Sequence, residues 1–236
     1  MSFEDITVLV PTYNRGKFLS LFLMGMKCQT YPHDKITIII DDDGPDKFIQ
    51  DIELVRQHML PMKITYITDK PRRSIGKKRN DLIKEAQTKI FAFVDDDDIY
   101  FPSYLQYSYE TLKSQKVGCV GSDKMLFCMS DRDFSIHGIN CGDNKIMIHE
   151  ATMMMTKKFY RSSVGFGDHS HGEGKELFTG NTKNVAITEI NGLMCCLQHG
   201  GNTIDKLRFA NDDNKVDIQI TDEMKDMLQN ILNNTI

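Results

Sequence analysis

The sequence lacks the features that mark membrane proteins and dedicated nucleic-acid binders. No apolar run approaches the roughly 18 residues that a membrane helix needs, because Ser20 and Gly25 interrupt the richest stretch, residues 18–26. There is no excess of basic residues either, since 29 Lys and Arg stand against 33 Asp and Glu, a net charge of −4. A duplex binder normally has a basic face, so we expect neither a membrane span nor a nucleic-acid partner.

Signals for secretion and for cysteine chemistry are also missing. The six cysteines contain no CxxC pair, and we expect them to be reduced, buried thiols. The sequence begins MSFEDITVLVP, with acids where a signal peptide would have bases, so we expect a cytoplasmic protein. Hydrophobic residues make up 40% and charged residues 26% of the chain, which excludes a mostly disordered protein.

Short apolar runs alternate with segments of helical length as far as residue 121. The expected strands are rich in β-branched and aromatic residues and cover residues 6–10, 36–40, 64–68, 90–94 and 117–120. The expected helices lie between them, at residues 17–29, 46–59, 75–87 and 103–114. This alternation predicts an α/β fold with a Rossmann-like, mainly parallel sheet that is covered by helices on both faces.

The second half of the sequence predicts a smaller, mixed region. Weak strand signals occur at residues 145–148 and 193–197, and residues 165–174 contain four glycines. Towards the end, Leu228 and Ile231 lie on the apolar face of an amphipathic helix with Thr221 as its N-cap. We expect one domain, residues 1–236, with two halves that meet near residue 121.

Two acidic clusters directly follow expected strands. Asp41, Asp42 and Asp43 follow the second strand, and the four aspartates at positions 95–98 follow the fourth. Parallel sheets bind ligands at the carboxyl ends of their strands. Adjacent carboxylates repel one another unless they are neutralised, and a hard divalent cation with substrate phosphates is the usual partner. The two clusters therefore predict a metal site, although solvated acidic turns are the alternative.

A basic segment lies between the acidic clusters. Residues 71–80 read PRRSIGKKRN and include Arg72, Arg73, Lys77, Lys78 and Arg79. These side chains either form a solvated helix face or bind an anion such as a diphosphate across a cleft from the acids. In a net acidic protein, a metal site beside such cations favours a nucleotide diphosphate over a polynucleotide.

Four strings, in order, resemble the GT-A-fold glycosyltransferases of family 2. They are VLVPTYNRGKFL, IIIDDDGPD, GKKRN and FAFVDDDDIYFPSYL, and they cover about the first 120 residues. The resemblance implies that residues 1–121 bind a nucleotide-sugar donor, in particular a UDP-sugar. It further implies that residues 122–236 bind a glycan or glycoprotein acceptor, and that the sugar passes to a hydroxyl with inversion and with the help of Mn²⁺ or Mg²⁺. Compact enzymes of this kind occur in bacteria and in large DNA viruses.

The resemblance also implies roles for individual residues. Asp43 would hydrogen-bond the nucleobase. Asp97 would bind the metal, with Asp95 and His199, from the string HGGN, as further ligands. The other residues that it places around the donor are Pro11, Thr12, Tyr13, Arg15, Arg79, Asp95 and Asp96.

The general base is expected from the second half. The family often has an acidic pair before a short helix, and GEGKELF, residues 172–178, matches except that Gly174 stands at the second acidic position. Glu173 is the first candidate, with Asp168 and Glu176 after it, although such acids also cap helices. The HxH spacing of His169 and His171 lacks further ligands for zinc, so acceptor contacts or ordinary loop positions explain them better.

Other functions stay open at this point. A sugar-nucleotide nucleotidyltransferase shares the sheet and the metal carboxylates, but it normally has a glycine-rich basic turn after the first strand, where residues 12–16 contain one glycine. A degenerate GT-A domain would bind a nucleotide-sugar or a partner without catalysis. The imperfect acidic pair favours this second alternative, and the intact acidic clusters oppose it.

Overall fold

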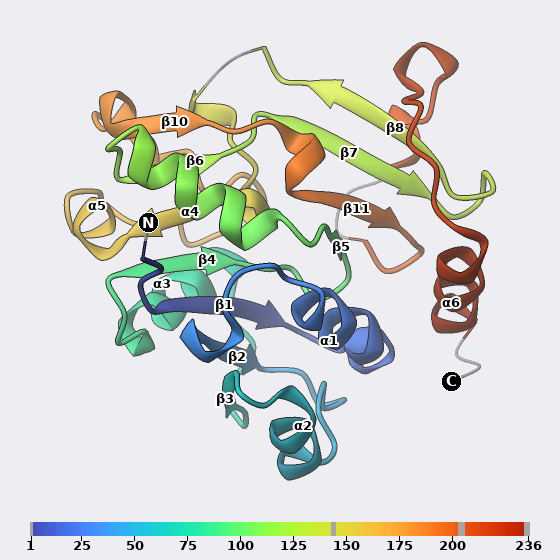
Figure 1. Cartoon of the computed structure of the whole chain (residues 1–236), viewed down its shortest axis with the longest axis horizontal. Coiled ribbons are helices and arrows are strands. Elements are labelled where there is room, and N and C mark those ends of the chain that lie inside the picture. Colours follow the sequence, from blue (N-terminus) through green and yellow to red (C-terminus); the bar gives the residue numbers. More distant parts are fainter. Residues whose placement is uncertain (1, 143–144, 203–205, 234–236) are drawn as a thin grey trace.

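The computed structural model describes residues 2–142, 145–202 and 206–233. Its centre is a seven-stranded sheet in the order β10-β6-β9-β4-β1-β2-β3 (Figure 1). The strands are β1 (Ile6–Thr12), β2 (Ile36–Asp42), β3 (Lys63–Ile67), β4 (Ile90–Phe93), β6 (Cys119–Gly121), β9 (Met154–Thr156) and β10 (Val185–Ile187). All neighbours in this sheet are parallel except β9, which runs antiparallel to β4 and β6. The predicted mainly parallel sheet is confirmed.

Helices cover both faces of the central sheet. They are α1 (Leu19–Lys27), α2 (Ile52–Met59), α3 (Ile75–Glu85), α4 (Tyr104–Ser114) and α5 (Lys157–Arg161). Successive side chains of a strand point to opposite faces. Accordingly Val8 of β1 belongs to the same apolar cluster as Phe22 of α1, whereas its neighbour Leu9 belongs to a second cluster with Leu82 of α3. Two buried faces explain why the strands read as nearly continuous apolar runs.

A second sheet extends the fold beyond the central one. Its order is β5-β11-β7-β8, with β5 (Ile99–Tyr100), β7 (Lys124–Met129), β8 (Ser135–Asn140) and β11 (Met194–Gln198) (Figure 1). The strand expected at residues 193–197 is confirmed as β11. The strand expected at residues 145–148 is wrong, because Lys145–Met147 form a 3₁₀ helix. Ile148 is buried there while Ile146 is 42% exposed, and so short an apolar run does not distinguish a strand from a helical turn.

The amphipathic helix near the end of the chain is confirmed as α6 (Asp222–Leu232). The hydroxyl of Thr221 accepts a hydrogen bond from the main-chain N–H of Met224 at 3.3 Å, as an N-cap does. Leu228 and Ile231 are buried in the same apolar cluster as Val10 of β1 and Leu197 of β11. One continuous core therefore joins both sheets and this helix.

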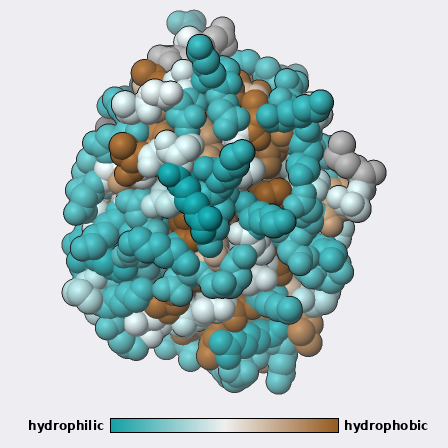
Figure 2. Space-filling view, turned by 90° about the vertical axis from the view of Figure 1, so that its left-hand side faces the viewer, coloured by the Kyte–Doolittle hydropathy of each residue, from teal (hydrophilic) through white to brown (hydrophobic). Residues whose placement is uncertain are grey.

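The face in Figure 2 is mainly hydrophilic, with hydrophobic residues scattered across it. None of the helices in the described part of the chain combines the length and the apolar character needed to cross a bilayer. All six cysteines are free, and four are buried, but Cys28 is exposed and Cys141 is half-buried. The expectation of burial is wrong for these two, because Cys28 ends α1 at the surface and Cys141 lies just beyond the edge strand β8.

Candidate active site

A cavity of about 470 Å³ lies at the carboxyl ends of β1 and β4 and reaches the second sheet. Its first-half wall includes Pro11, Thr12, Tyr13, Arg15, Arg72, Arg73, Lys78, Arg79 and Asp95 to Asp98. Its second-half wall includes Met125, Phe127, His149, Glu150, Glu173, Lys206 and Arg208. The fold thus brings most of the predicted donor residues into one hollow, where parallel sheets ordinarily bind ligands.

The first acidic cluster holds the basic segment in place and does not line the cavity. Arg73 donates from Nη2 to Asp41 Oδ1 at 2.6 Å and from its main-chain N–H to Asp43 Oδ2 at 2.7 Å. Lys78 is ion-paired with Asp43, whose residue is only 6% exposed. Asp42 accepts hydrogen bonds from two main-chain N–H groups and a tyrosine hydroxyl. Asp43, expected to contact the nucleobase, is thus buried behind the cations.

The basic segment faces the cavity, as its anion-binding interpretation requires. Arg72, Lys78 and Arg79 line the hollow, whereas Lys77 points to solvent. The guanidinium carbon of Arg72 lies 4.2 Å from the ring centre of Tyr13. Gly76 allows the backbone at the start of α3 to lie close to Gly167, because a Cβ at position 76 would lie 1.8 Å from the carbonyl oxygen of Gly167. The loop at residues 165–174 therefore packs closely against the start of α3.

Asp95 and Asp96 are held by residues of the first half. Asp95 Oδ1 accepts a hydrogen bond from Arg79 Nη2 at 3.1 Å, and the hydroxyl of Thr12 donates to Asp96. Burial, followed by the charge of Asp97, raises the pKa of Asp96 well above its usual value. Arg79 is buried as well, but Asp95 and Glu173 outweigh that burial and raise its pKa, so the guanidinium stays charged.

Asp97 and Asp98 are held by residues from the end of the chain. Asp97 Oδ2 lies 2.9 Å from Nε2 of His199 and 3.3 Å from Nη2 of Arg15. Burial alone would raise the pKa of Asp97, but the hydrogen bond with His199 and the charges of Lys206 and Arg15 lower it to about 2. Burial raises the pKa of Asp98 to about 7 against the opposing charge of Lys206, which lies 3.4 Å away. Asp97 is therefore held in its ionised form.

Asp97 and His199 fit a hard divalent cation. Two neighbouring ligands of an octahedral ion, each at about 2.1 Å, are separated by about 3 Å. The 2.9 Å between Asp97 Oδ2 and His199 Nε2 matches this separation. In the part of the chain that the structure describes, no three His, Cys, Asp or Glu side chains gather as a metal site, and Asp95 is engaged with Arg79. The donor set is one carboxylate oxygen and one imidazole nitrogen, so a divalent cation held there would complete its shell with water and substrate phosphates.

Of the three candidate bases, Glu173 alone lines the cavity. Its Oε1 accepts a hydrogen bond from Nε of Arg79 at 3.1 Å, and the residue is 4% exposed. Burial raises the pKa of Glu173, which Arg79 partly counteracts. Asp168 accepts a hydrogen bond from the hydroxyl of Ser74 at 2.5 Å, and Glu176 lies 3.4 Å from Nε2 of His169, both outside the cavity.

The structure adds residues that sequence reasoning missed. Lys206 reaches the aspartate cluster from a segment without a recognisable motif. His149 and Glu150 enter the cavity just before the buried run that leads into β9. Burial lowers the pKa of His149 to about 4, so it is neutral near pH 7. A polar pair directly before an apolar run is the one weak signal that could have drawn attention to it.

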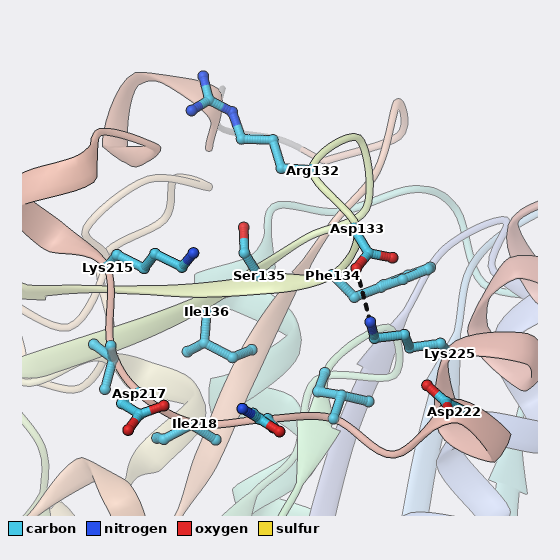
Figure 3. Close-up of a pocket in the computed structure, with 13 residues that line it drawn as sticks. Arg132, Asp133, Phe134, Ser135, Ile136, Lys215, Asp217, Ile218, Asp222 and Lys225 are labelled. Atoms are coloured by element: carbon cyan, nitrogen blue, oxygen red, sulfur yellow. Dashed lines mark hydrogen bonds and ion pairs between the residues drawn. The ribbon is translucent and has the colours of Figure 1, made fainter.

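A second hollow, of about 700 Å³, lies between the start of β8 and the segment that leads into α6 (Figure 3). At one end Lys225 Nζ lies 2.8 Å from Asp133 Oδ2, the pair that the dashed line in Figure 3 joins. Its charged lining balances in sign: Arg132, Lys215, Lys225, Asp133, Asp217 and Asp222. This hollow contains neither acidic cluster, so the first cavity is the candidate active site.

Comparisons with known proteins show similarity in sequence and in fold. The family model described as glycosyl transferase family 2 matches residues 7–167. Poly(ribitol-phosphate) beta-N-acetylglucosaminyltransferase TarS of Staphylococcus aureus is 31% identical over 93 residues, which are 39% of this chain and 16% of TarS. The processive diacylglycerol beta-glycosyltransferase of Mycoplasma genitalium is 26% identical over 133 residues, 56% of this chain and 39% of that protein.

Solved structures share the fold at low sequence identity. The crystal structure of S. aureus TarS 1-349 in complex with UDP-GlcNAc has a TM-score of 0.65 at 15% identity and covers 84% of this chain and 60% of that one. The mannosyltransferase PcManGT from Pyrobaculum calidifontis, in complex with GDP-Man and Mn²⁺, has a TM-score of 0.62 at 16% identity, covering 84% and 55%. The chain thus spans less than two-thirds of the length of each of these relatives.

Proposed function

The chain belongs to glycosyl transferase family 2, and on this premise we propose that it transfers a sugar from a nucleotide-sugar donor to a hydroxyl group of a glycan or glycoprotein. One observation carries the proposal. An ionised aspartate, Asp97, lies beside the cations Arg15 and Lys206 in a cavity at the carboxyl ends of the central strands. A nucleoside diphosphate with a bound divalent cation has the complementary charges.

UDP is the donor nucleotide that we propose. The TarS structure above contains UDP-GlcNAc, whereas the mannosyltransferase structure contains GDP-Man, and the nucleotide panel below distinguishes these two bases. Tyr13 and Arg72 offer flat groups at the cavity wall for a nucleobase. Asp43, which the resemblance assigns to the nucleobase, would contact it only after Lys78 moved aside. Asp95 and Asp96 are proposed to face the ribose and diphosphate, next to Thr12 and Arg79.

The leaving diphosphate requires positive charge. We propose that Asp97 and His199 hold Mn²⁺ or Mg²⁺, which when bound supplies Lewis-acid stabilisation to the departing phosphate. Arg15 is positioned beside them: its Nη2 donates to the carbonyl oxygen of Gly201 at 2.7 Å. It thereby ties the loop after β1 to the loop after β11. Preorganised cations of this kind stabilise charge as it develops, without having to reorient during the reaction.

The acceptor hydroxyl must lose a proton as it attacks the sugar from the face opposite the diphosphate, which inverts the anomeric carbon. A carboxylate on the acceptor side of the cavity is the proposed proton acceptor. Two carboxylates, Glu173 and Glu150, lie there among the described residues of the second-half wall. The wall beside them contains Met125 and Phe127, and we propose that this region receives the acceptor.

A thermal-shift panel tests the donor proposal. UDP, GDP, dTDP and CDP are each added with and without Mn²⁺, and a ligand at about 100 times its dissociation constant adds about 2.7 kcal/mol of stability. We expect a Mn²⁺-dependent rise in melting temperature with UDP, which Asp97→Asn removes and the exposed control Asp34→Asn keeps. A native chain that no nucleotide stabilises contradicts the proposal. Tight UDP binding without release of UDP from any UDP-sugar would favour a binding-only domain.

A further inference from the structure

Glu150 and Glu173 lie in the same wall but are held differently. Glu150 begins a 3₁₀ helix (Glu150–Thr152) that packs against β4 and β6, so it stands on the sheet rather than in the loop. Its Oε1 accepts a hydrogen bond from the main-chain N–H of Gly174 at 2.9 Å. Its other oxygen takes no hydrogen bond from the residues that the structure describes. Glu150 thus presents a half-buried carboxylate with one oxygen available to a ligand.

Gly174 leaves room for this carboxylate. A Cβ built on Gly174 would lie 2.8 Å from Oε1 of Glu150 and 3.0 Å from its Cγ. The backbone of Gly174 is not in the left-handed region, so conformation does not demand glycine there. The carboxylate of Glu150 occupies the space that a side chain at position 174 would fill, so such a side chain would have to displace this flexible carboxylate.

Glu173 is hydrogen-bonded to a different partner. Its Oε1 is bonded to Nε of Arg79, and Arg79 also holds Asp95. If Glu173 were protonated, Arg79 would lose one of its two ion pairs and keep the one with Asp95. Taking up a proton would thus break an ion pair of Glu173, whereas Glu150 is hydrogen-bonded to an uncharged main-chain donor and makes no ion pair among the described residues.

From this geometry we infer that Glu150 is the catalytic residue that takes the proton from the acceptor hydroxyl, and that Glu173 is a positioning residue acting through Arg79. This inference rests on the proposed transferase function. The acceptor O–H bond breaks and its proton passes to Glu150. The acceptor oxygen bonds to the anomeric carbon while the bond from that carbon to the phosphate oxygen breaks, and its electron pair leaves with the nucleoside diphosphate.

The test uses variants of the whole chain with UDP-N-acetylglucosamine as donor and water as acceptor, measuring UDP release. Glu150→Gln keeps the shape but cannot take a proton, and we expect kcat to fall by about 100-fold or more. UDP binding should stay unchanged, and the exposed control Glu110→Gln should turn over like the native chain. Among the described residues, Glu173 and Arg79 interact electrostatically with Glu150, and His149 precedes it in the chain. If protonation of Glu150 causes the acid limb of the kcat/KM profile, that limb should vanish in Glu150→Gln.

A swap supplies the second measurement. Removing the Glu150 side chain clears the space beside position 174. The double variant Glu150→Ala with Gly174→Asp should therefore have a kcat about tenfold or more above that of Glu150→Ala alone. A Glu150→Gln variant that keeps its native rate overturns the inference. The inference is also overturned if Glu150→Gln loses rate but keeps the acid limb, and if the double variant is no faster than Glu150→Ala. That pattern would indicate a structural role for Glu150. If the native chain binds UDP and releases it from the donor, these outcomes concern the role of Glu150 alone. If the native chain shows neither UDP binding nor UDP release, the transferase proposal and the inference about Glu150 are both overturned.

Discussion

At the scale of single residues, Arg73 illustrates how the site stays organised before any ligand binds. Its guanidinium contacts Asp41 at 2.6 Å and Asp81 at 3.0 Å, and its main-chain N–H is bonded to Asp43. Burial disfavours its charge, but Asp41 and the other carboxylates outweigh burial and raise the pKa of Arg73. The acidic cluster after β2 is therefore compensated internally, and the cluster after β4 is the one that faces the cavity.

We predict that Arg73→Met destabilises the fold by about 1–3 kcal/mol, because Asp41 and Asp43 lose the hydrogen bonds of the guanidinium and keep only Lys70 and Lys78 as cationic partners. The adjacent Arg72 is exposed, so Arg72→Met should change the free energy of unfolding by less than about 0.5 kcal/mol. Urea unfolding of the two variants at neutral pH measures both values. Equal effects from the two substitutions would mean that the Arg73 cluster does not stabilise the fold.

At the scale of elements, two sets of packing contacts position the second-half wall of the cavity. The loop at residues 165–174 is hydrogen-bonded to α3: the N–H of Gly76 donates to the carbonyl of His169 at 3.1 Å, and Asn80 Nδ2 donates to that of Phe166 at 2.8 Å. On the other side, α6 seals the core near β1 and β11 through Leu228 and Ile231. The first set orients Glu173, and the second supports the sheets between which the cavity lies.

Leu228→Ala should cost about 2–5 kcal/mol of stability, because it opens a cavity under α6. Asp226 lies on the exposed face of the same helix, so Asp226→Ala is the matched control and should be nearly neutral. Thermal melts of both variants beside the native chain make the comparison. If Leu228→Ala unfolds at the native temperature, α6 contributes little to the core.

At the scale of the whole molecule, charge is distributed unevenly. The chain has a net charge of −4, yet the cavity wall includes Arg15, Arg72, Arg79, Lys206 and Arg208. A negatively charged ligand is thus repelled by the molecule as a whole and attracted by the cavity. Short-range attraction of this kind is weakened by salt where the cations are exposed.

We predict that the dissociation constant for UDP rises as NaCl increases from about 0.05 M to about 0.5 M, over which the screening length falls severalfold. Arg72→Ala should make this dependence shallower, because Arg72 is an exposed cation of the cavity wall. Lys77→Ala, which removes an exposed cation of α3 outside the wall, should leave the slope unchanged. Titration calorimetry across the salt series gives the slopes, and identical slopes for all three proteins would contradict an electrostatic contribution from Arg72.

The strands and helices of the first half could be predicted from the sequence because their signals are local. Strand and helix periods reflect geometry within a few residues, and β1, β2, β4 and α3 begin where expected. The short strands β7 to β10 were missed, since they depend on partners that only the assembled sheet supplies. The same limit produced the wrong strand at residues 145–148.

By itself the sequence determined the alternating α/β order and the placing of aspartates at strand ends, because both follow from neighbouring residues. Only the tertiary structure decided what each carboxylate does, because its partners come from far along the chain. Asp97 meets His199 across 102 positions, and Glu150 meets Gly174 across 24. Asp43 and Asp97 look alike in sequence, yet the first is buried against Lys78 and the second lines the cavity.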